Sequence, residues 1–119
     1  MSPIPSFIAL AALVLAGCAS QTPASKGTHL VYRDAAGNPT LQIDYPSADV
    51  CRKVEMVASK NARCQPDSAS SQLRASATLR YDPPGMLVEG HYADLARCQS
   101  ANSTMARGVE LVKPCTAKQ

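Results

Sequence analysis

Cysteine is the residue type in this sequence with the widest chemistry, because a thiol can form a disulfide, bind a metal ion or act as a nucleophile. Four of the five cysteines lie after position 50, namely Cys51, Cys64, Cys98 and Cys115. They contain no C-x-x-C pair, which is the spacing typical of structural zinc sites. An even number of cysteines in a short chain favours two disulfides instead.

The two histidines, His29 and His91, are the other side chains suited to catalysis or metal binding. Neither belongs to an H-x-x-x-H or H-E-x-x-H pattern, so the helical ligand pair of many zinc enzymes is missing. The sequence also lacks the G-x-S-x-G motif of serine hydrolases and a glycine-rich phosphate loop. We therefore predict a protein that is not an enzyme, with no catalytic residues, no metal site and no cofactor.

Acidic residues flank the points where predicted strands lead into predicted helices. Asp44 and Asp49 do so in the first half of the chain, and Glu89 and Asp94 in the second. Two carboxylates can cleave a glycosidic bond, but an acid at a helix start is also favoured by capping and by the helix dipole. We prefer the second interpretation. The aromatic residues that could form a sugar-stacking surface, or simply pack at strand ends, are Tyr32, Tyr45, Tyr81 and Tyr92.

The N-terminal region has an apolar stretch at residues 7–16 and ends in the run Leu15-Ala16-Gly17-Cys18. The stretch has the length of a signal-peptide core and is too short to span a bilayer. Although no lysine or arginine precedes it, the run before Cys18 resembles the lipobox of bacterial lipoproteins. The resemblance implies a signal peptide at residues 1–17, lipidation of Cys18, and a cell-envelope location. Ala19 after the cysteine implies the outer membrane, with the protein facing the periplasm.

The rest of the chain is expected to be one small domain on a tether. Residues 18–28 are small and polar, which is typical of a flexible linker, and residues 29–119 remain for a single domain. The formal net charge is +3, but the basic residues are scattered, so nucleic acid is not an expected partner. The expected partners are the membrane, through the lipid, and an envelope protein or peptidoglycan.

Hydrophobic periodicity predicts two strands, a helix and a strand in the first half. Leu41, Ile43 and Tyr45 alternate with polar residues and should share one face of a strand. Ser47 is expected to cap the helix, with Cys51 and Val57 on its apolar face. The predicted elements are strands at 29–33 and 40–45, a helix from the cap at 47 to about 60, and a strand at 61–65.

The second half repeats this order. Its predicted elements are strands at 73–81 and 86–91, a helix from the cap at 94 to about 105, and a strand at 109–112 that Pro114 ends. Each half has a D-x-x-G turn between its first two strands. Tyr45, Ser47 and Cys51 also match Tyr92, Asp94 and Cys98 in order and spacing. The halves are either two copies of a ββαβ unit or a coincidence between short alternating segments.

The element order favours one disulfide in each half, Cys51–Cys64 and Cys98–Cys115. A helix that runs from Cys51 to residue 60 climbs about 13–14 Å, and the few residues that follow can just return that distance if extended. The first bridge is therefore tight unless the helix ends earlier. In the second half more residues lie between the end of the helix and Cys115, so the second bridge is not tight.

These expectations combine into an α+β fold with a largely antiparallel sheet, two helices and two disulfides. Two functions stay open. One is a lipid-anchored binding or structural module of the cell envelope. The other is a small disulfide-bonded inhibitor of a lytic enzyme or protease, for which the turn at Asp82-Pro83-Pro84-Gly85 is the most rigid candidate loop.

Overall fold

The computed structural model describes residues 27–118, so the predicted signal peptide, Cys18 and most of the predicted tether lie outside the described residues. Within this range no helix is long and apolar enough to cross a membrane. The elements, with η1 as a single 3-10 turn, are β1 (His29–Arg33), β2 (Pro39–Asp44), α2 (Ala48–Val57), β3 (Ala62–Gln65), η1 (Ser70–Gln72), β4 (Ala75–Tyr81), β5 (Met86–Tyr92), α3 (Leu95–Ala101) and β6 (Val109–Ala117).

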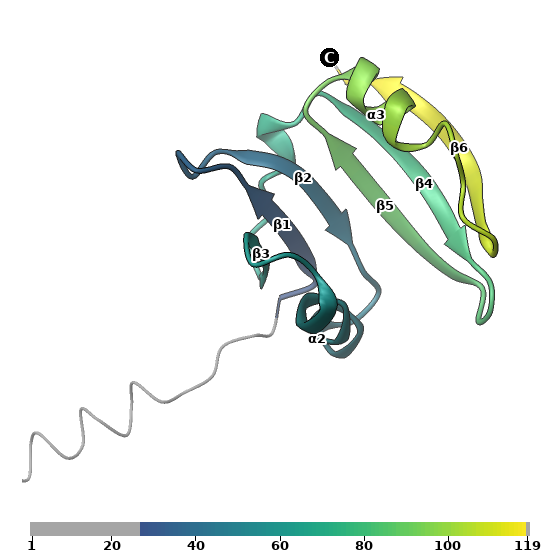
Figure 1. Ribbon diagram of the computed structural model, residues 1–119, viewed down its shortest axis with the longest axis horizontal. Helices are drawn as coiled ribbons and strands as arrows, with labels where there is room; N and C mark the ends of the chain where they lie inside the picture. Colours follow the sequence, from purple (N-terminus) through teal and green to yellow (C-terminus); the bar gives the residue numbers. More distant parts are fainter. Residues whose placement is uncertain (1–26, 119) are drawn as a thin grey trace, which may run out of the picture.

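The six strands form one antiparallel sheet in the order β3-β1-β2-β5-β4-β6. Helix α2 packs on β1 and β3, and α3 packs on β4, β5 and β6. Both helices lie on the same face of the sheet (Figure 1). The α+β class, the antiparallel sheet and the two helices are therefore confirmed. Strands β2 and β5 lie in the middle and join the two halves of the chain.

Both helices begin at the residues that the sequence predicts. The Ser47 side chain accepts a hydrogen bond from the backbone N–H of Val50, and Asp94 accepts one from Arg97. Both helices end earlier than predicted. Helix α3 ends at Ala101 because the segment that follows is rich in poor helix formers, and the Asn102 side chain hydrogen-bonds the carbonyl of Cys98.

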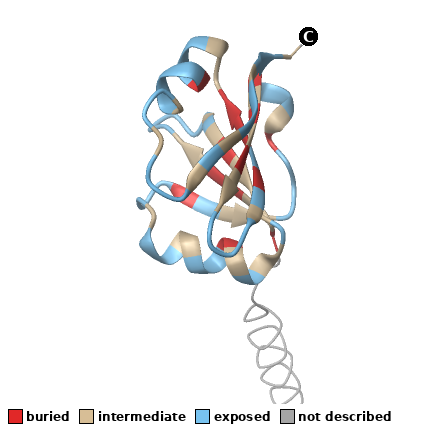
Figure 2. Ribbon diagram, turned by 90° about the vertical axis from the view of Figure 1, so that its right-hand side faces the viewer, coloured by how far each residue is buried: buried red, intermediate tan, exposed pale blue. Residues whose placement is uncertain are grey.

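One disulfide in each half ties the helix to the last strand of that half. Cys51 bonds Cys64 with a Cα–Cα distance of 6.2 Å, and Cys98 bonds Cys115 at 5.9 Å. These are the two pairs that the sequence favours. Helix α2 ends at Val57, which leaves more chain for the return to Cys64. Buried residues lie along the strands, whereas the outer surfaces of the helices are mostly exposed (Figure 2). Cys51 and Cys98 are fully buried.

Three further details of the prediction are wrong. Val57 is 84% exposed, because a step of six residues from Cys51 carries it to another side of the helix. Strand β4 begins at Ala75, because the chain before it forms a 3-10 turn. Strand β6 runs through Pro114 to Ala117. It is an edge strand, where a missing N–H is tolerated, and its pairing with β4 is irregular in this region.

The sheet has one face covered by the helices and one face without them. Residues directly paired in antiparallel strands point to the same side. Leu30, Ile43 and Gly90 therefore share the helix face, whereas Asp44 and Glu89 share the opposite, helix-free face. The loop between β3 and β4 reaches the helix-free face, since Ser68 and Ala69 both hydrogen-bond the side chain of Gln42, which lies there.

Candidate functional site

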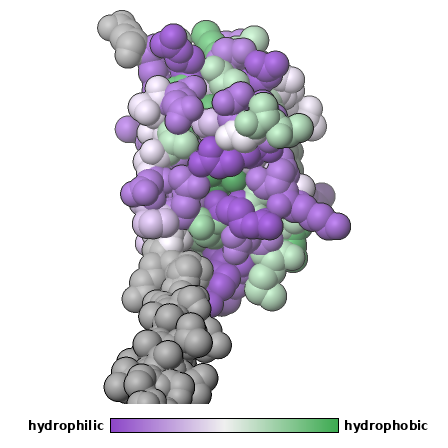
Figure 3. Space-filling model, turned by 90° about the vertical axis from the view of Figure 1, so that its left-hand side faces the viewer, coloured by the Kyte–Doolittle hydropathy of each residue, from purple (hydrophilic) through white to green (hydrophobic). Residues whose placement is uncertain are grey.

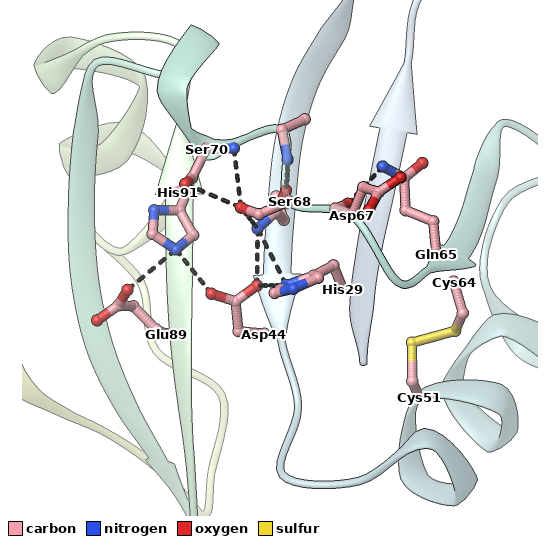
Figure 4. Close-up of polar contacts among 12 residues, drawn as sticks. His29, Asp44, Cys51, Cys64, Gln65, Asp67, Ser68, Ser70, Glu89 and His91 are labelled. Carbon is pink, nitrogen blue, oxygen red and sulfur yellow. Dashed lines mark hydrogen bonds and ion pairs between the residues drawn. A yellow bond between two sulfur atoms is a disulfide. The ribbon is translucent and has the colours of Figure 1, made fainter. Parts of the chain in front are cut away.

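A group of polar side chains lies on the helix-free face at the junction of the two halves. Paired registers bring it together, because β1, β2 and β5 are neighbours and Asp44 is directly opposite both His29 and Glu89. His91 is opposite Gln42 in the next cross-strand row. Lys118 reaches the same place from the end of β6. We call the set the polar cluster: His29, Gln42, Asp44, Glu89, His91 and Lys118. Figure 4 labels its members His29, Asp44, Glu89 and His91.

Asp44 is the centre of the polar cluster. Its Oδ1 accepts hydrogen bonds from Nδ1 of His29 at 2.6 Å and from Nε2 of Gln42 at 2.7 Å. Its Oδ2 lies 2.9 Å from Nε2 of His91. Burial alone would raise the pKa of Asp44, but these hydrogen bonds outweigh it and lower the pKa from 3.8 to about 2. The carboxyl group is thus ionised throughout the physiological range.

His91 links the two carboxylates to the end of the chain. Its ring is 5% exposed, and Nε2 lies 2.9 Å from Asp44 and 3.0 Å from Oε1 of Glu89. Nδ1 lies 2.8 Å from Nζ of Lys118, which also donates to the carbonyl of Ser70. A lysine ammonium can only donate, so Nδ1 accepts and the neutral ring carries its proton on Nε2. Burial lowers the pKa of Lys118.

Gln42 is fully buried and holds the loop after β3 against the sheet. Its Nε2 donates to the hydroxyl of Ser68 at 3.0 Å, and its Oε1 accepts from the N–H of Ala69 at 2.7 Å. Every buried side-chain nitrogen or oxygen in residues 27–118 has a hydrogen-bond partner. The polar cluster is therefore a pre-organised network rather than a set of independent surface groups.

The acid pairs considered in the sequence are not the ones that the fold brings together. Asp49 is on the exposed start of α2 beside Arg52, and Asp94 caps α3. Asp44 instead meets Glu89 and both histidines, which sequence reasoning missed. The available signal was the polar alternation within two otherwise apolar strands, at Gln42 and Asp44 and again at Glu89 and His91.

The helix face has a different feature, a hollow beside α3. Its volume is about 290 Å³, and its sheet floor includes Leu41, Ile43, Tyr81 and Tyr92. The chain that follows α3 closes one side with Asn102, Met105 and neighbouring residues. The hollow is mostly apolar with a few hydrogen-bonding groups, as ligand sites usually are. By contrast, the surface at the β3 side of the molecule is mainly hydrophilic with scattered apolar spots (Figure 3).

The four tyrosines divide between two places. Tyr81 and Tyr92 line the hollow, whereas Tyr32 and Tyr45 pack on the buried cluster that contains Leu30 and Cys51. Burial raises the pKa of Tyr45 and of Tyr81. The Tyr92 hydroxyl accepts a hydrogen bond from Asn102. Two of the four tyrosines therefore belong to the hollow.

Comparisons with protein-family models, with curated proteins and with solved structures give no match to this chain.

Proposed function

We propose that this protein is a lipid-anchored module of the bacterial cell envelope that binds a partner through its helix face. The lipobox-like run before Cys18 supports the anchor and the location at the outer membrane, facing the periplasm. Two disulfides in a domain of this size support an oxidising compartment. The lipid would hold the module at the membrane, and the polar residues before β1 would let it reach a partner.

The observation that carries the binding role is the tyrosine-lined hollow beside α3. Tyrosine offers a flat ring for packing and a hydroxyl for hydrogen bonds, and it is enriched at binding surfaces. Tyr81, which is partly exposed, and Thr104 line the hollow beside apolar side chains, a mixture that suits a glycan, so peptidoglycan is the partner that we propose first. An envelope protein is the other partner that this surface fits.

The test uses the mature protein without lipid, made with Cys18→Ser, and purified peptidoglycan sacculi. We expect the protein to sediment with sacculi and Tyr81→Ala to weaken this binding. Leu87→Ala is the matched control, because Leu87 is 52% exposed and lies on the helix-free face opposite Arg80. Equal loss in both variants, or no binding to sacculi, would refute peptidoglycan as the partner.

We propose that the module is not an enzyme. Within residues 27–118, both imidazoles hydrogen-bond the carboxylate of Asp44, and His91 also accepts from the amine of Lys118; neither hydrogen-bonds a hydroxyl or thiol that could act as nucleophile. Replacing both His29 and His91 with alanine should leave the cellular role of the protein unchanged. A variant with a native circular-dichroism spectrum that behaves like a deletion strain would contradict this view.

The second candidate function is inhibition of a lytic enzyme or protease. The β4–β5 turn at Asp82-Pro83-Pro84-Gly85 supports it, because this turn is exposed and two backbone hydrogen bonds hold it, Asp82 N–H to Gly108 and Gly85 N–H to Tyr81. A rigid exposed loop can enter an enzyme cleft with little loss of entropy. Inhibition of peptidoglycan hydrolysis that disappears with Pro83→Ala and Pro84→Ala would favour this function over the first.

We also propose that the two halves are copies of one ββαβ unit. Each half runs strand, strand, helix and strand, and each joins its helix cysteine to its last strand. The sheet order places the equivalent strands β2 and β5 side by side and the equivalent strands β3 and β6 at the two edges. Sequences of homologues should then preserve the equivalences Ser47 with Asp94 and Cys51 with Cys98. Homologues that lack one half yet keep a complete sheet would contradict the duplication.

A further inference from the structure

Three side chains of the polar cluster form a set of metal ligands. Oδ2 of Asp44 and Oε1 of Glu89 lie 2.9 and 3.0 Å from Nε2 of His91, and all three atoms are within 4.8 Å of one another. They come from the adjacent strands β2 and β5, and the imidazole points between the two carboxylates (Figure 4). We propose that Asp44, Glu89 and His91 bind a divalent transition-metal ion, with zinc as the first candidate.

Two of the three distances between ligand atoms suit zinc with little movement, and the two carboxylate oxygens lie within 4.8 Å of each other. A tetrahedral zinc ion with bonds of about 2.0–2.1 Å holds its ligand atoms about 3.3 Å apart. The two nitrogen-to-oxygen distances need to open by only a few tenths of an ångström. Glu89 is the most exposed of the three side chains, at 53%, so it can adjust and ions can enter beside it. An imidazole with two carboxylates favours zinc and similar ions over calcium or magnesium, which prefer oxygen ligands.

The groups behind Asp44 give it the support that metal ligands usually have. Nδ1 of His29 and Nε2 of Gln42 both donate to its Oδ1, which leaves Oδ2 directed at His91. Gln42 is fully buried and is itself held by the loop after β3. Such outer hydrogen bonds orient a ligand before the metal arrives and reduce the cost of binding.

One group opposes the ion, the ammonium of Lys118. Without metal, Lys118 donates to Nδ1 of His91, and the proton on Nε2 lies between the two carboxylates. An ion that takes the Nε2 lone pair needs the other neutral tautomer of the ring, with its proton on Nδ1. In that tautomer Nδ1 can no longer accept from the ammonium, so Lys118 gives up a proton to solvent and its amine accepts from Nδ1. Because metal uptake costs this proton, removing Lys118 should strengthen metal binding, whereas removing a ligand should weaken it.

The experiment measures zinc binding to the mature Cys18→Ser protein with its disulfides intact, by titration calorimetry. We expect one zinc ion per chain, with a heat that depends on the buffer because a proton is released. His91→Gln and Glu89→Gln should each weaken binding by more than about tenfold, since each removes a ligand. Glu110→Gln is the matched control, because that exposed acid pairs with Arg80 and is not one of the three ligands, and it should have no effect.

Lys118→Met is the decisive variant. It should tighten zinc binding several-fold, a gain that damage to the fold cannot imitate. Cobalt, used as a visible probe of the same site, should give a tetrahedral absorption band that His91→Gln abolishes. No zinc binding to the folded wild type, or binding that survives both ligand substitutions, would overturn the proposal. Since Glu89 is half exposed, Glu89→Gln keeps the test valid if His91→Gln does not fold. Sacculus binding, which uses the helix face, should be unchanged in both variants.

Discussion

Replacing Asp44 with asparagine is the sharpest test of the polar cluster as a structural network. The variant keeps the size of the side chain but removes the charge that accepts hydrogen bonds from His29, Gln42 and His91. The pKa of Asp44 falls from 3.8 to about 2 in the folded protein, and one pKa unit corresponds to about 1.4 kcal/mol. The side chain is 27% exposed, so solvent screening reduces the effect. We expect a loss of about 1–2 kcal/mol in the free energy of unfolding at neutral pH.

The stabilisation by Asp44 should depend on pH in a defined direction. The folded pKa is below the unfolded value, so the ionised carboxylate stabilises the fold above about pH 4. This contribution is lost as the pH falls through about 2, because the folded state must then take up the proton as well. The difference in stability between wild type and Asp44→Asn should therefore be constant near neutral pH and shrink between about pH 4 and 2.

Urea unfolding, followed by circular dichroism at a series of pH values, measures this difference. Asp49→Asn is the control, because Asp49 is an exposed acid whose ion pair with Arg52 lies at the surface. It should change the free energy of unfolding by less than about 0.5 kcal/mol. If wild type and Asp44→Asn differ by the same amount at pH 2 and pH 6, the charge of Asp44 does not stabilise the network and the reasoning is wrong.

Mass spectrometry of membrane-extracted protein should show a lipidated Cys18 as the first residue, and a mature chain that starts elsewhere without lipid would contradict this. Peptide mapping without reduction should recover Cys98 joined to Cys115, and replacing both with serine should cost about 2–5 kcal/mol in the free energy of unfolding. A Cβ added at Gly90 would lie 2.6 Å from the hydroxyl oxygen of Tyr92. Gly90→Ala should therefore cost about 1–3 kcal/mol in urea unfolding, and an effect below about 0.5 kcal/mol would refute the close approach.

Much of the local structure could be predicted from the sequence, because it depends on neighbouring residues. Ser47 and Asp94 cap the helices since each side chain meets a backbone N–H three residues ahead. The alternation of Leu41 and Ile43 with Gln42 identifies a strand with two unlike faces. The pairing of Cys51 with Cys64 follows from the short return after a helix, which the early end of α2 makes easier.

The polar cluster and the path of β6 were decided by the tertiary structure. Nothing in the spacing of Asp44 and His91 shows that β2 and β5 are neighbours, because that contact depends on how the two halves join. The local preference of Pro114 predicts the end of a strand at that residue. Strand β6 nevertheless continues past it, because β6 is at the edge of the sheet, where the missing N–H costs no hydrogen bond. Local preferences act over a few residues, whereas strand order and register are set by burying the apolar faces of the whole chain together.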